Sequence, residues 1–413
     1  MPKRLIYVPL EPYRSRYTEY TAVAGGVYET IFRQEDVEFI SVRPDVGDKV
    51  LQIKRGRVVD YLNRADYGFV QVYALLSRLA DGAIDAKTDA VFFDDFWTPG
   101  FEMWPYGQSL TLGPSFSQHV PTYSFCYAQS TDPYDFTAPM HWWMRPMELG
   151  WTNTQRAVMC ASKEMCDQWA AGGLPVKKLR WCGLPYYGSR ILDIFGIPAV
   201  DPASSRKVQV VYSSRFDAEK NPRFLFDLAK RLKHVQFIVC TGLSASRFIE
   251  TADVELLRAP SNIEFRTGLT KQQYFAILQE SKVQFNCASQ DFVSFTLLDA
   301  TLNGCAPLYP NLLTFPDALN QQAAHLYIGD PGAGPDTAAY RAAIEDAAAK
   351  VDALLASDPA DYSWVYRKYD LAVTRMLRAM GFDTKRVPFS MDVLCAETDL
   401  DVVRGMLEKE EQF

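Results

Sequence analysis

Short runs of apolar, β-branched and aromatic residues alternate along the chain with segments of helical periodicity. In the first half, two segments between the runs predict helices, Arg64–Leu79 and Lys163–Ala171. The runs themselves predict the strands Leu5–Leu10, Glu38–Val42, Ala90–Asp94, Thr122–Ala128, Arg156–Ala161 and Leu179–Cys182. Strands that alternate with helices predict a mostly parallel, doubly wound α/β sheet.

The alternation stops at a segment rich in Pro and small residues, 193–206, and then restarts. Five further strands are expected, at 208–213, 235–241, 263–268, 283–288 and 306–309, with intervening helices at 224–232, 271–280 and 294–302. Two longer helical stretches follow, 337–356 and 362–380. We therefore predict an N-terminal α/β domain at 1–195, a second at 206–360, and C-terminal helices at 361–413 that pack back on the first domain.

Composition narrows the class of protein. A chain of 413 residues with 48% hydrophobic and 23% charged residues can build two globular domains. There is no apolar run of transmembrane length and no signal-peptide pattern, so we expect a cytoplasmic protein without a membrane partner. Eight cysteines and four histidines form no CxxC pair and no metal-ligand cluster, so buried thiols and structural histidines are expected. The net charge of −7 argues against wholesale nucleic-acid binding but leaves room for a local basic groove.

Chemistry-bearing residues cluster where two strands of the second half end. Arg215 and Lys220 follow strand 208–213, and Asp291 follows strand 283–288. The helix that begins next carries hydroxyl and carboxyl groups, Ser294, Thr296 and Asp299. In open α/β sheets, ligands bind at the carboxyl ends of strands. Free amides at a helix start bind phosphate, and a basic pair can neutralise the charge that grows on a leaving diphosphate.

Each residue taken singly has a plainer interpretation. Asp291 can cap the helix, and Asp299, ~12 Å further along at helical rise, can be a solvated helix residue. Arg215 and Lys220 can be surface charges beside a helix start. An anion clamp next to two carboxylates, however, suits a nucleotide-sugar, because the carboxylates can bind the hydroxyls of the sugar and the ribose.

In this order the motifs resemble the retaining GT-B glycosyltransferases, which include glycogen synthases, sucrose synthases and bacterial mannosyltransferases. The resemblance covers about residues 155–310 and depends on Ser214–Pro222, on Asp291 to Asp299 followed by Ala300, and on Gly304 and Pro307. It implies two Rossmann-like domains facing each other across a cleft. It also implies a nucleotide-sugar cosubstrate such as UDP-glucose, with no other cofactor and no metal.

The resemblance also implies roles for residues of the donor site. Arg215 and Lys220 bind the donor diphosphate, Asp291 faces the donor sugar, and Asp299 holds the ribose. The remaining donor-binding residues lie near the phosphates (Ser294, Phe295 and Thr296) or hold the base (Gly268 and Leu269). Family members have Glu where this chain has Asp291 and Asp299, and the shorter side chains leave the sugar's identity open.

The N-terminal half departs from the family. A Gly-rich loop is missing after the first strand, and the candidates to line the acceptor side are Glu11, Arg14, Arg16, Thr18 and Trp97. Many members have a His after the strand that matches 122–128. Here Asp132 or Gln129 could take its polar role, although Asp132 can also form an Asp-Pro turn. Asp94 or Asp95 could be the acceptor's base.

The region 96–151 is rich in aromatic residues, some in expected loops such as Trp104–Gly107, which suit a planar or sugar acceptor. Basic residues of the same half add positive charge: Arg14, Arg16, Lys54, Arg55 and Arg57. By analogy with phage DNA glucosyltransferases, we predict retaining hexosyl transfer to a hydroxymethylated base in DNA, of the 5-hydroxymethylcytosine type. A sugar, small-molecule or protein acceptor stays open, as do a UDP-sugar epimerase and a non-catalytic nucleotide-sugar binder. An NAD-dependent enzyme is disfavoured because no G-x-G-x-x-G follows either first strand.

Overall fold

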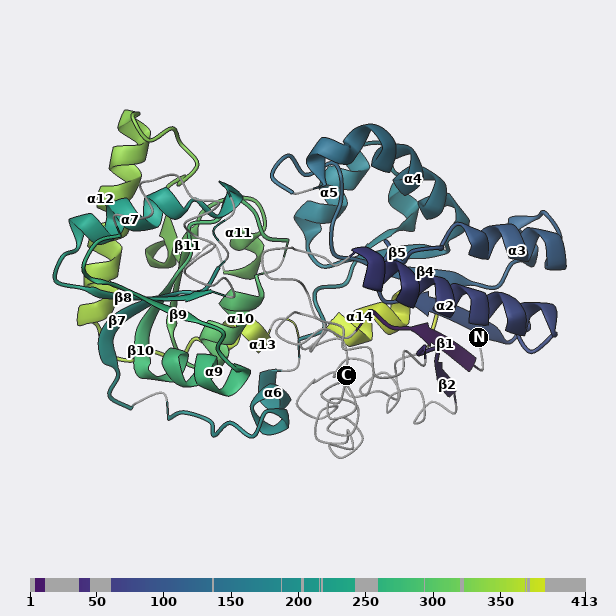
Figure 1. Ribbon diagram of the computed structural model, residues 1–413, viewed down its shortest axis with the longest axis horizontal. Coiled ribbons are helices and arrows are strands. Elements are labelled where there is room, and N and C mark those ends of the chain that lie inside the picture. The colour runs from purple at the N-terminus through teal and green to yellow at the C-terminus, as the bar shows by residue number, and fades with distance from the viewer. Residues whose placement is uncertain are drawn as a thin grey trace. The chain divides into compact units, whose positions relative to one another are not determined.

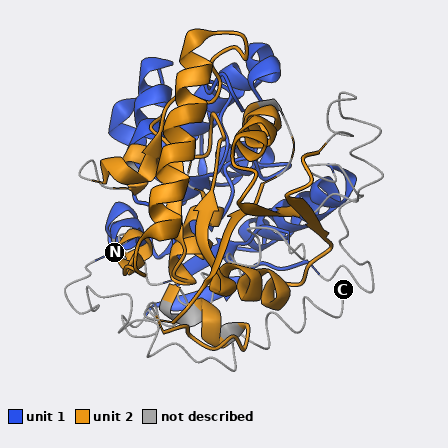
Figure 2. Ribbon diagram, turned by 90° about the vertical axis from the view of Figure 1, so that its left-hand side faces the viewer, with its two compact units in different colours: residues 1–187, 369–413 blue, residues 188–368 orange. Residues whose placement is uncertain are grey.

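The computed structural model describes residues 4–11, 37–44, 61–135, 137–186, 188–201, 204–214, 216, 218–241, 259–292, 294–319, 323–367, 369 and 372–382. The chain divides into two compact units (Figure 2). Unit 1 comprises residues 1–187 and 369–413, and unit 2 comprises residues 188–368.

Unit 1 contains a six-stranded sheet in the order β2-β1-β3-β4-β5-β6 (Figure 1). Its strands are β1 (Arg4–Val8), β2 (Glu38–Ser41), β3 (Asp89–Phe93), β4 (Thr122–Cys126), β5 (Ala157–Cys160) and β6 (Leu179–Trp181). Every neighbouring pair is parallel. The central strands β3 and β4 are buried throughout, as parallel strands covered on both faces must be.

The helices of unit 1 are α2 (Tyr61–Ala80), α3 (Met103–Leu112), α4 (His141–Thr154), α5 (Lys163–Ala171) and α14 (Ala372–Ala379), with 3-10 turns η1 (Phe116–Gln118), η2 (Ala138–Met140) and η3 (Val176–Lys178). The inner face of α2 buries Leu75 and Leu79. On the same face, the Gln71 amide donates to the carbonyls of Pro9 and Val42, at 2.8 and 2.9 Å. This amide therefore holds the chain segments that follow β1 and β2 against the helix.

Unit 2 contains a second six-stranded sheet in the order β12-β11-β10-β7-β8-β9. Its strands are β7 (Lys207–Tyr212), β8 (Gln236–Thr241), β9 (Ile263–Thr267), β10 (Ser281–Phe285), β11 (Ala306–Pro310) and β12 (Tyr327–Ile328), all paired in parallel. Its helices are α6 (Gly188–Ile194), α7 (Pro222–Arg231), α9 (Lys271–Glu280), α10 (Phe295–Leu302), α11 (Phe315–Ala318), α12 (Ala338–Ala356) and α13 (Ser363–Arg367), with turns η4 (Ala218–Lys220) and η6 (Ala324–Leu326).

In each sheet the order of the strands reverses once. The reversal lies between β1 and β3 in unit 1 and between β7 and β10 in unit 2. At such a switch point, the loops that follow the two strands diverge and leave room for a ligand at the carboxyl edge. Of the predicted site residues, those that are described and directly follow β1, β3, β7 and β10 therefore lie at the two switch points.

The predicted α/β architecture with two parallel sheets is confirmed, and several bounds differ from the prediction. The first unit ends at residue 187 rather than 195, because α6 packs against α10 of unit 2. The return to unit 1 comes at residue 369 rather than 361, and α14 then packs against β5. The single helix expected at 362–380 is two helices, α13 and α14.

The segment Trp104–Gly107 lies within α3 and not in a loop. Pro105 occupies the first turn of the helix, where a proline leaves no hydrogen bond unmade. Gly107 faces α2 so closely that a Cβ there would lie 2.2 Å from Leu76 Cδ2. Both residues that suggested a loop are thus compatible with this helix, and Trp104 is fully buried.

Candidate functional site

Two loops meet at the switch point of unit 2, one after β7 and one after β10. The Ser289 amide donates to the Glu219 carbonyl at 2.7 Å. The Asn221 side-chain amide donates to the Cys287 carbonyl and to Ser289 Oγ, each at 2.8 Å. Asn221 has a left-handed backbone (φ 47°) and is followed directly by Pro222, which begins α7. These bonds join the two loops into one framework at the carboxyl edge of the sheet.

Lys220 is the buried cation of this framework. Its Nζ donates to the Gln290 carbonyl at 2.7 Å and to Asp291 Oδ1 at 2.8 Å. The Lys220 side chain is 8% exposed and that of Asp291 is 26% exposed. An ammonium group has three donors, and these two bonds use two of them. A positive charge is therefore fixed at the switch point, with a carboxylate beside it on the more exposed side.

Helix α10 begins next to this pair. Ser294 is its N-cap, and Ser294 Oγ accepts from the Leu297 amide. Ser294 Oγ also lies 2.9 Å from Thr296 Oγ1, which in turn lies 3.2 Å from the Tyr309 hydroxyl. Burial raises the pKa of Tyr309, so its phenol stays neutral and keeps these hydroxyls in place. The N-terminal end of α10, with half-buried Phe295 in its first turn, favours an anion through the helix dipole.

Asp299 lies one turn further along α10 and is not a solvated helix residue. It is 3% exposed, and its Oδ2 lies 3.5 Å from Lys271 Nζ at the start of α9. Burial, followed by the Asp299 charge, raises the pKa of the buried Tyr274 phenol. The carboxylate is thus directed into the unit and partly neutralised by Lys271. Its assignment to the ribose remains a prediction.

The residues that follow Asp299 in the motif, Asn303 and Gly304, end helix α10. The Asn303 side chain donates to the Asp299 carbonyl at 2.8 Å and closes the last turn of α10. Gly304 has φ +76°, and a Cβ there would lie 2.3 Å from an Arg206 guanidinium nitrogen. The sequence Asn303–Pro307 is therefore required by chain reversal and packing before β11.

Several predicted site residues lie outside the described residues: Arg215, Arg14, Arg16 and Thr18. Gly268 and Leu269 are described and follow β9, where Gly268 has φ +66° with open space around it. The segment 242–258, which follows the neighbouring strand β8, also lies outside the described residues. The proposed contact of Gly268 and Leu269 with the base stays a prediction.

The switch point of unit 1 holds a buried charge network. Arg64 of α2 donates to Glu11 Oε1 at 3.0 Å, to Asp95 Oδ2, and to the Trp97 carbonyl at 3.2 Å. The side chains of Glu11 and Asp95 are only 5% and 6% exposed. Sequence reasoning named both carboxylates but missed Arg64, because nothing in the sequence links a helix residue to partners 53 and 31 positions away.

Asp94 lies beside this network and is also buried. The Tyr7 hydroxyl donates to Asp94 Oδ2 at 2.7 Å. The pKa of Asp94 is raised to about 7, chiefly by burial and secondarily by the neighbouring Asp95 charge, against the lowering effect of the Tyr7 hydrogen bond. The indole of Trp97 is fixed by a 3.0 Å bond from Nε1 to the Ala128 carbonyl. The carboxylates proposed as an acceptor base are thus largely engaged within the unit.

The loop after β4 places its two polar candidates in the interior. Asp132 is fully buried, and its Oδ1 accepts from the Tyr134 amide at 2.9 Å, which is the geometry of the alternative Asp-Pro turn. Gln129 is also fully buried and its amide donates to Gln168 Oε1 of α5. Any polar role of these two side chains toward a substrate remains a prediction.

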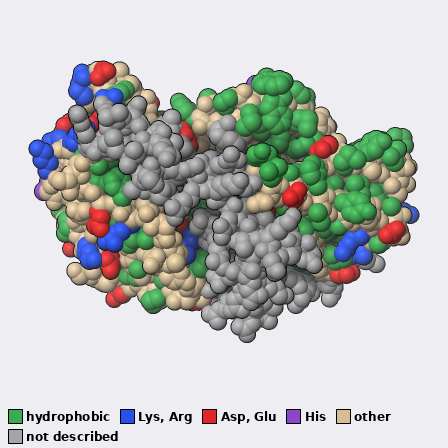
Figure 3. Space-filling model, in the orientation of Figure 1, with side chains coloured by type: hydrophobic (Ala, Val, Ile, Leu, Met, Phe, Trp, Pro, Cys, Tyr) green, Lys and Arg blue, Asp and Glu red, His purple; other side chains and the backbone are tan. Residues whose placement is uncertain are grey.

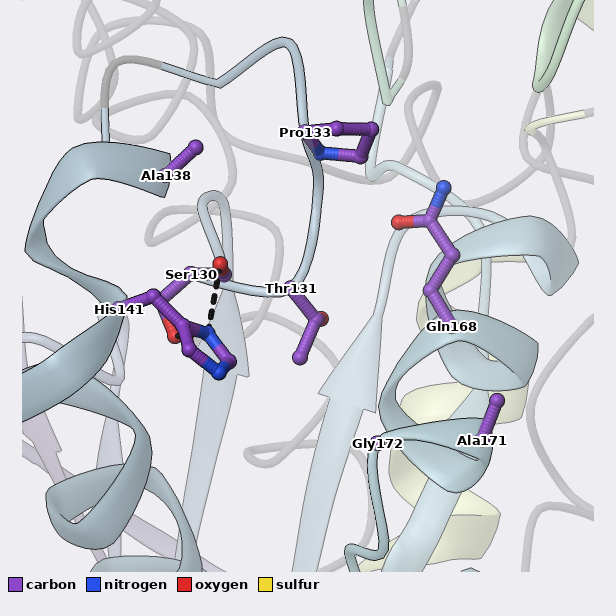
Figure 4. Close-up of a pocket in the computed structure, with 8 residues that line it drawn as sticks. All are labelled: Ser130, Thr131, Pro133, Ala138, His141, Gln168, Ala171 and Gly172. Carbon is purple, nitrogen blue, oxygen red and sulfur yellow. Dashed lines mark hydrogen bonds between the residues drawn. The ribbon is translucent and has the colours of Figure 1, made fainter.

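A groove of about 500 Å³ opens beside this loop (Figure 4). It lies between the loop, the start of α4 and the end of α5, and His141 points toward Ser130 within it. His141 was expected to be structural. It is exposed, and the only sequence signal for it would have been recognition of α4, which it begins.

No group of three or more His, Cys, Asp or Glu side chains in the described part of the chain could hold a metal ion. Among the described helices, none is both long and apolar enough to cross a bilayer. Seven cysteines are described and none forms a disulfide.

No protein-family model matches the chain. Among solved structures, sucrose-phosphate synthase from Thermosynechococcus elongatus is similar, with 11% identity, 99% of each chain covered and a TM-score of 0.59. The lipopolysaccharide outer core galactosyltransferase WaaB follows with 12% identity, 99% of each chain covered and a TM-score of 0.52. Anabaena Alr3699/HepE in complex with UDP-glucose has 10% identity and a TM-score of 0.51 over 92% of this chain and 98% of its own. These likenesses confirm the two-domain GT-B fold.

Proposed function

We propose that the protein is a glycosyltransferase that transfers a hexose from a nucleotide-sugar, UDP-glucose or a close relative, to a hydroxyl acceptor. The observation that carries the proposal is the position of Lys220 at the switch point of unit 2, beside Asp291 and the start of α10. A fixed cation and a helix N-terminus suit a diphosphate, and the adjacent carboxylate suits sugar hydroxyls. The fold shared with solved glycosyltransferases supports the same assignment.

In this proposal, the protein's contribution is electrostatic. As the bond between the sugar and the diphosphate breaks, negative charge grows on the diphosphate. Lys220 and the amides of the first turn of α10 stabilise that charge, and Ser294 and Thr296 add hydrogen bonds. Asp291 faces the sugar and stabilises the positive charge of an oxocarbenium-like state. The transfer proceeds with retention, and the leaving diphosphate accepts the proton of the attacking hydroxyl.

The test is UDP release from a panel of UDP-sugars, each with neutral oligosaccharides or with DNA containing 5-hydroxymethylcytosine. We expect turnover with at least one UDP-hexose, an α-linked product from an α-linked donor by NMR, and loss of turnover in Lys220→Ala. The control is Lys230→Ala, which removes an exposed ammonium from α7 of the same unit. No UDP release from any UDP-sugar and acceptor, or full activity in Lys220→Ala, would overturn the proposal.

A further inference from the structure

The groove of unit 1 has a preformed polar wall. The Ser130 amide donates to Glu148 Oε1 at 2.7 Å, and Ser130 Oγ donates to Glu148 Oε2 at 2.9 Å. Glu148 is fully buried, and burial raises its pKa. These two hydrogen bonds to a buried carboxyl group fix the loop after β4 against α4. A wall held in this way does not need to be ordered when a ligand binds.

His141 projects from this wall with a defined orientation. Its Nδ1 lies 3.0 Å from the Ser130 carbonyl oxygen (dashed in Figure 4). Because a carbonyl only accepts, the hydrogen of the neutral ring belongs on Nδ1. Nε2 then carries the lone pair, and His141 is exposed where it lines the groove. The ring therefore offers the groove an acceptor for a hydroxyl hydrogen.

The opposite wall is formed by the end of α5, where a glycine lets the helix approach the loop after β4 closely. A Cβ on Gly172 would lie 2.9 Å from Thr131 Cγ2 and 3.3 Å from an Arg145 nitrogen. The backbone of Gly172 is an ordinary right-handed one (φ −69°), so its turn does not demand glycine. The close contact with Thr131 is therefore what favours glycine at this position. Ala171, beside it, also lines the groove and is exposed.

The chemistry of the groove selects a neutral ligand. The described side chains that line it carry hydroxyl, imidazole and amide groups and no charge. The Arg145 guanidinium, which lies close to Gly172, is 3.7 Å from Glu148 Oε2, and that carboxyl group offsets its charge. A nucleic-acid strand would require cations for its phosphates. Exposed aromatic residues adjoin the lining in sequence: Tyr134 follows Pro133 and is 50% exposed, and Trp142 follows His141 and is 79% exposed. Polar edges beside exposed rings match a sugar, which has hydroxyls at its rim and an apolar C–H face.

We propose that this groove binds the acceptor of the transfer reaction, that the acceptor is a neutral glycan, and that His141 Nε2 accepts a hydrogen bond from one of its hydroxyls. This inference rests on the proposed function, because the bound glycan is an acceptor only if the protein is a transferase. The presence of a glycan-binding groove can be tested without any donor.

Three substitutions test whether a glycan occupies the groove and whether His141 Nε2 accepts a hydrogen bond from it. His141→Asn keeps an amide near the position of Nδ1, able to donate to the Ser130 carbonyl, and removes Nε2. His141→Gln places an amide near Nε2. Ala171→Trp fills the groove from an exposed position without changing a buried residue. The matched control is His234→Ala, which removes an exposed imidazole from unit 2.

The experiment applies the 413-residue protein to an array of neutral glycans that also carries duplex DNA with 5-hydroxymethylcytosine. We expect binding to at least one neutral glycan, a loss of about tenfold in His141→Asn, partial recovery in His141→Gln, and no binding in Ala171→Trp. His234→Ala should bind as the wild type does. Binding to DNA alone, no glycan binding, or undiminished binding in Ala171→Trp would overturn the inference.

A parallel titration of wild-type protein with UDP distinguishes the two proposals. Glycan binding without UDP binding would contradict the transferase and leave a glycan-binding groove. UDP binding and turnover without glycan binding would contradict the groove assignment and leave the transferase intact.

Discussion

The two units share one architecture and differ in how the charged side chains at the switch point are paired and buried. In unit 1, Glu11 and Asp95 are paired with Arg64, and Asp94 accepts a hydrogen bond from Tyr7, so each carboxyl group has a partner inside the fold. In unit 2, Lys220 is buried while its partner Asp291 remains partly exposed. The same position in the same topology is therefore closed by internal partners in one unit and partly exposed in the other, as the proposed donor site requires.

The outer surfaces differ as well. Among the described residues, every large hydrophobic side chain that is exposed belongs to unit 1, except Val208. In Figure 3, such side chains gather over α3 and α4. In the described part of the chain, unit 1 therefore exposes apolar surface, whereas unit 2 exposes few large apolar side chains. Mutations at the switch point of unit 1 should therefore lower mainly the stability of the protein, and mutations at that of unit 2 should lower mainly turnover and UDP binding.

The largest effect is expected for Arg64→Ala in unit 1. The substitution leaves Glu11 and Asp95 buried without their cation and should lower the free energy of unfolding by about 3–5 kcal/mol in urea titrations. Adding Glu11→Gln and Asp95→Asn should restore part of the loss. Arg78→Ala, exposed in the last turn of the same helix, is the control. A loss below about 1 kcal/mol in Arg64→Ala would contradict the structural role.

The next effect is a pH dependence caused by Asp94. Its folded pKa of about 7 exceeds the ordinary value of 3.8, so the folded state holds a proton that the unfolded state has released. Its contribution to stability is therefore greatest below pH 4 and declines as pH rises toward 7, by up to about 4 kcal/mol. Asp94→Asn should remove this decline and be more stable than wild type at pH 8. Equal urea midpoints for the two proteins at pH 8 would contradict the assignment.

In unit 2, Asp291→Asn should impair turnover and leave stability nearly unchanged. Removal of the carboxylate that faces the sugar should lower kcat/KM about a hundredfold. UDP affinity should be equal or tighter, because a negative charge beside the diphosphate is gone. Steady-state kinetics and UDP titration measure the two quantities separately. If UDP affinity fell as far as turnover, Asp291 would be holding Lys220 in place and not facing the sugar.

The smallest effect is expected for Ser294→Ala. Loss of this N-cap should cost about 1 kcal/mol of stability and remove one hydrogen-bond donor from the proposed phosphate site. Thr337→Ala removes the N-cap of α12 and is the matched control. Only Ser294→Ala should also weaken UDP binding, by several-fold. Equal UDP binding in the two variants would show that Ser294 has a structural role alone.

The sequence was sufficient for much of the fold and for the donor side of the site. Short buried strands are readable as apolar runs, and motifs that follow strands must lie at a carboxyl edge. That reasoning placed Lys220, Asp291 and Ser294 together. It failed at α3, because Pro105 and Gly107 suggested a loop, and it named no helix at the position of α4.

Other features could not be read from the chain because they depend on tertiary packing. The burial of Asp299 against Lys271 joins two helices, and Arg64 reaches partners on two loops. The groove around His141 requires α4 and α5 to be positioned by β4 and β5. The positions of polar residues along the sequence do not show which of them will face one another.

The central claim is that the switch point of unit 2 binds a diphosphate through Lys220. The most direct measurement is calorimetric titration of UDP and of uridine into wild-type protein and Lys220→Ala. The account predicts that wild type prefers UDP over uridine by about a hundredfold or more, and that Lys220→Ala loses most of this preference while still binding uridine. An equal preference for UDP in both proteins, or none in wild type, would contradict it.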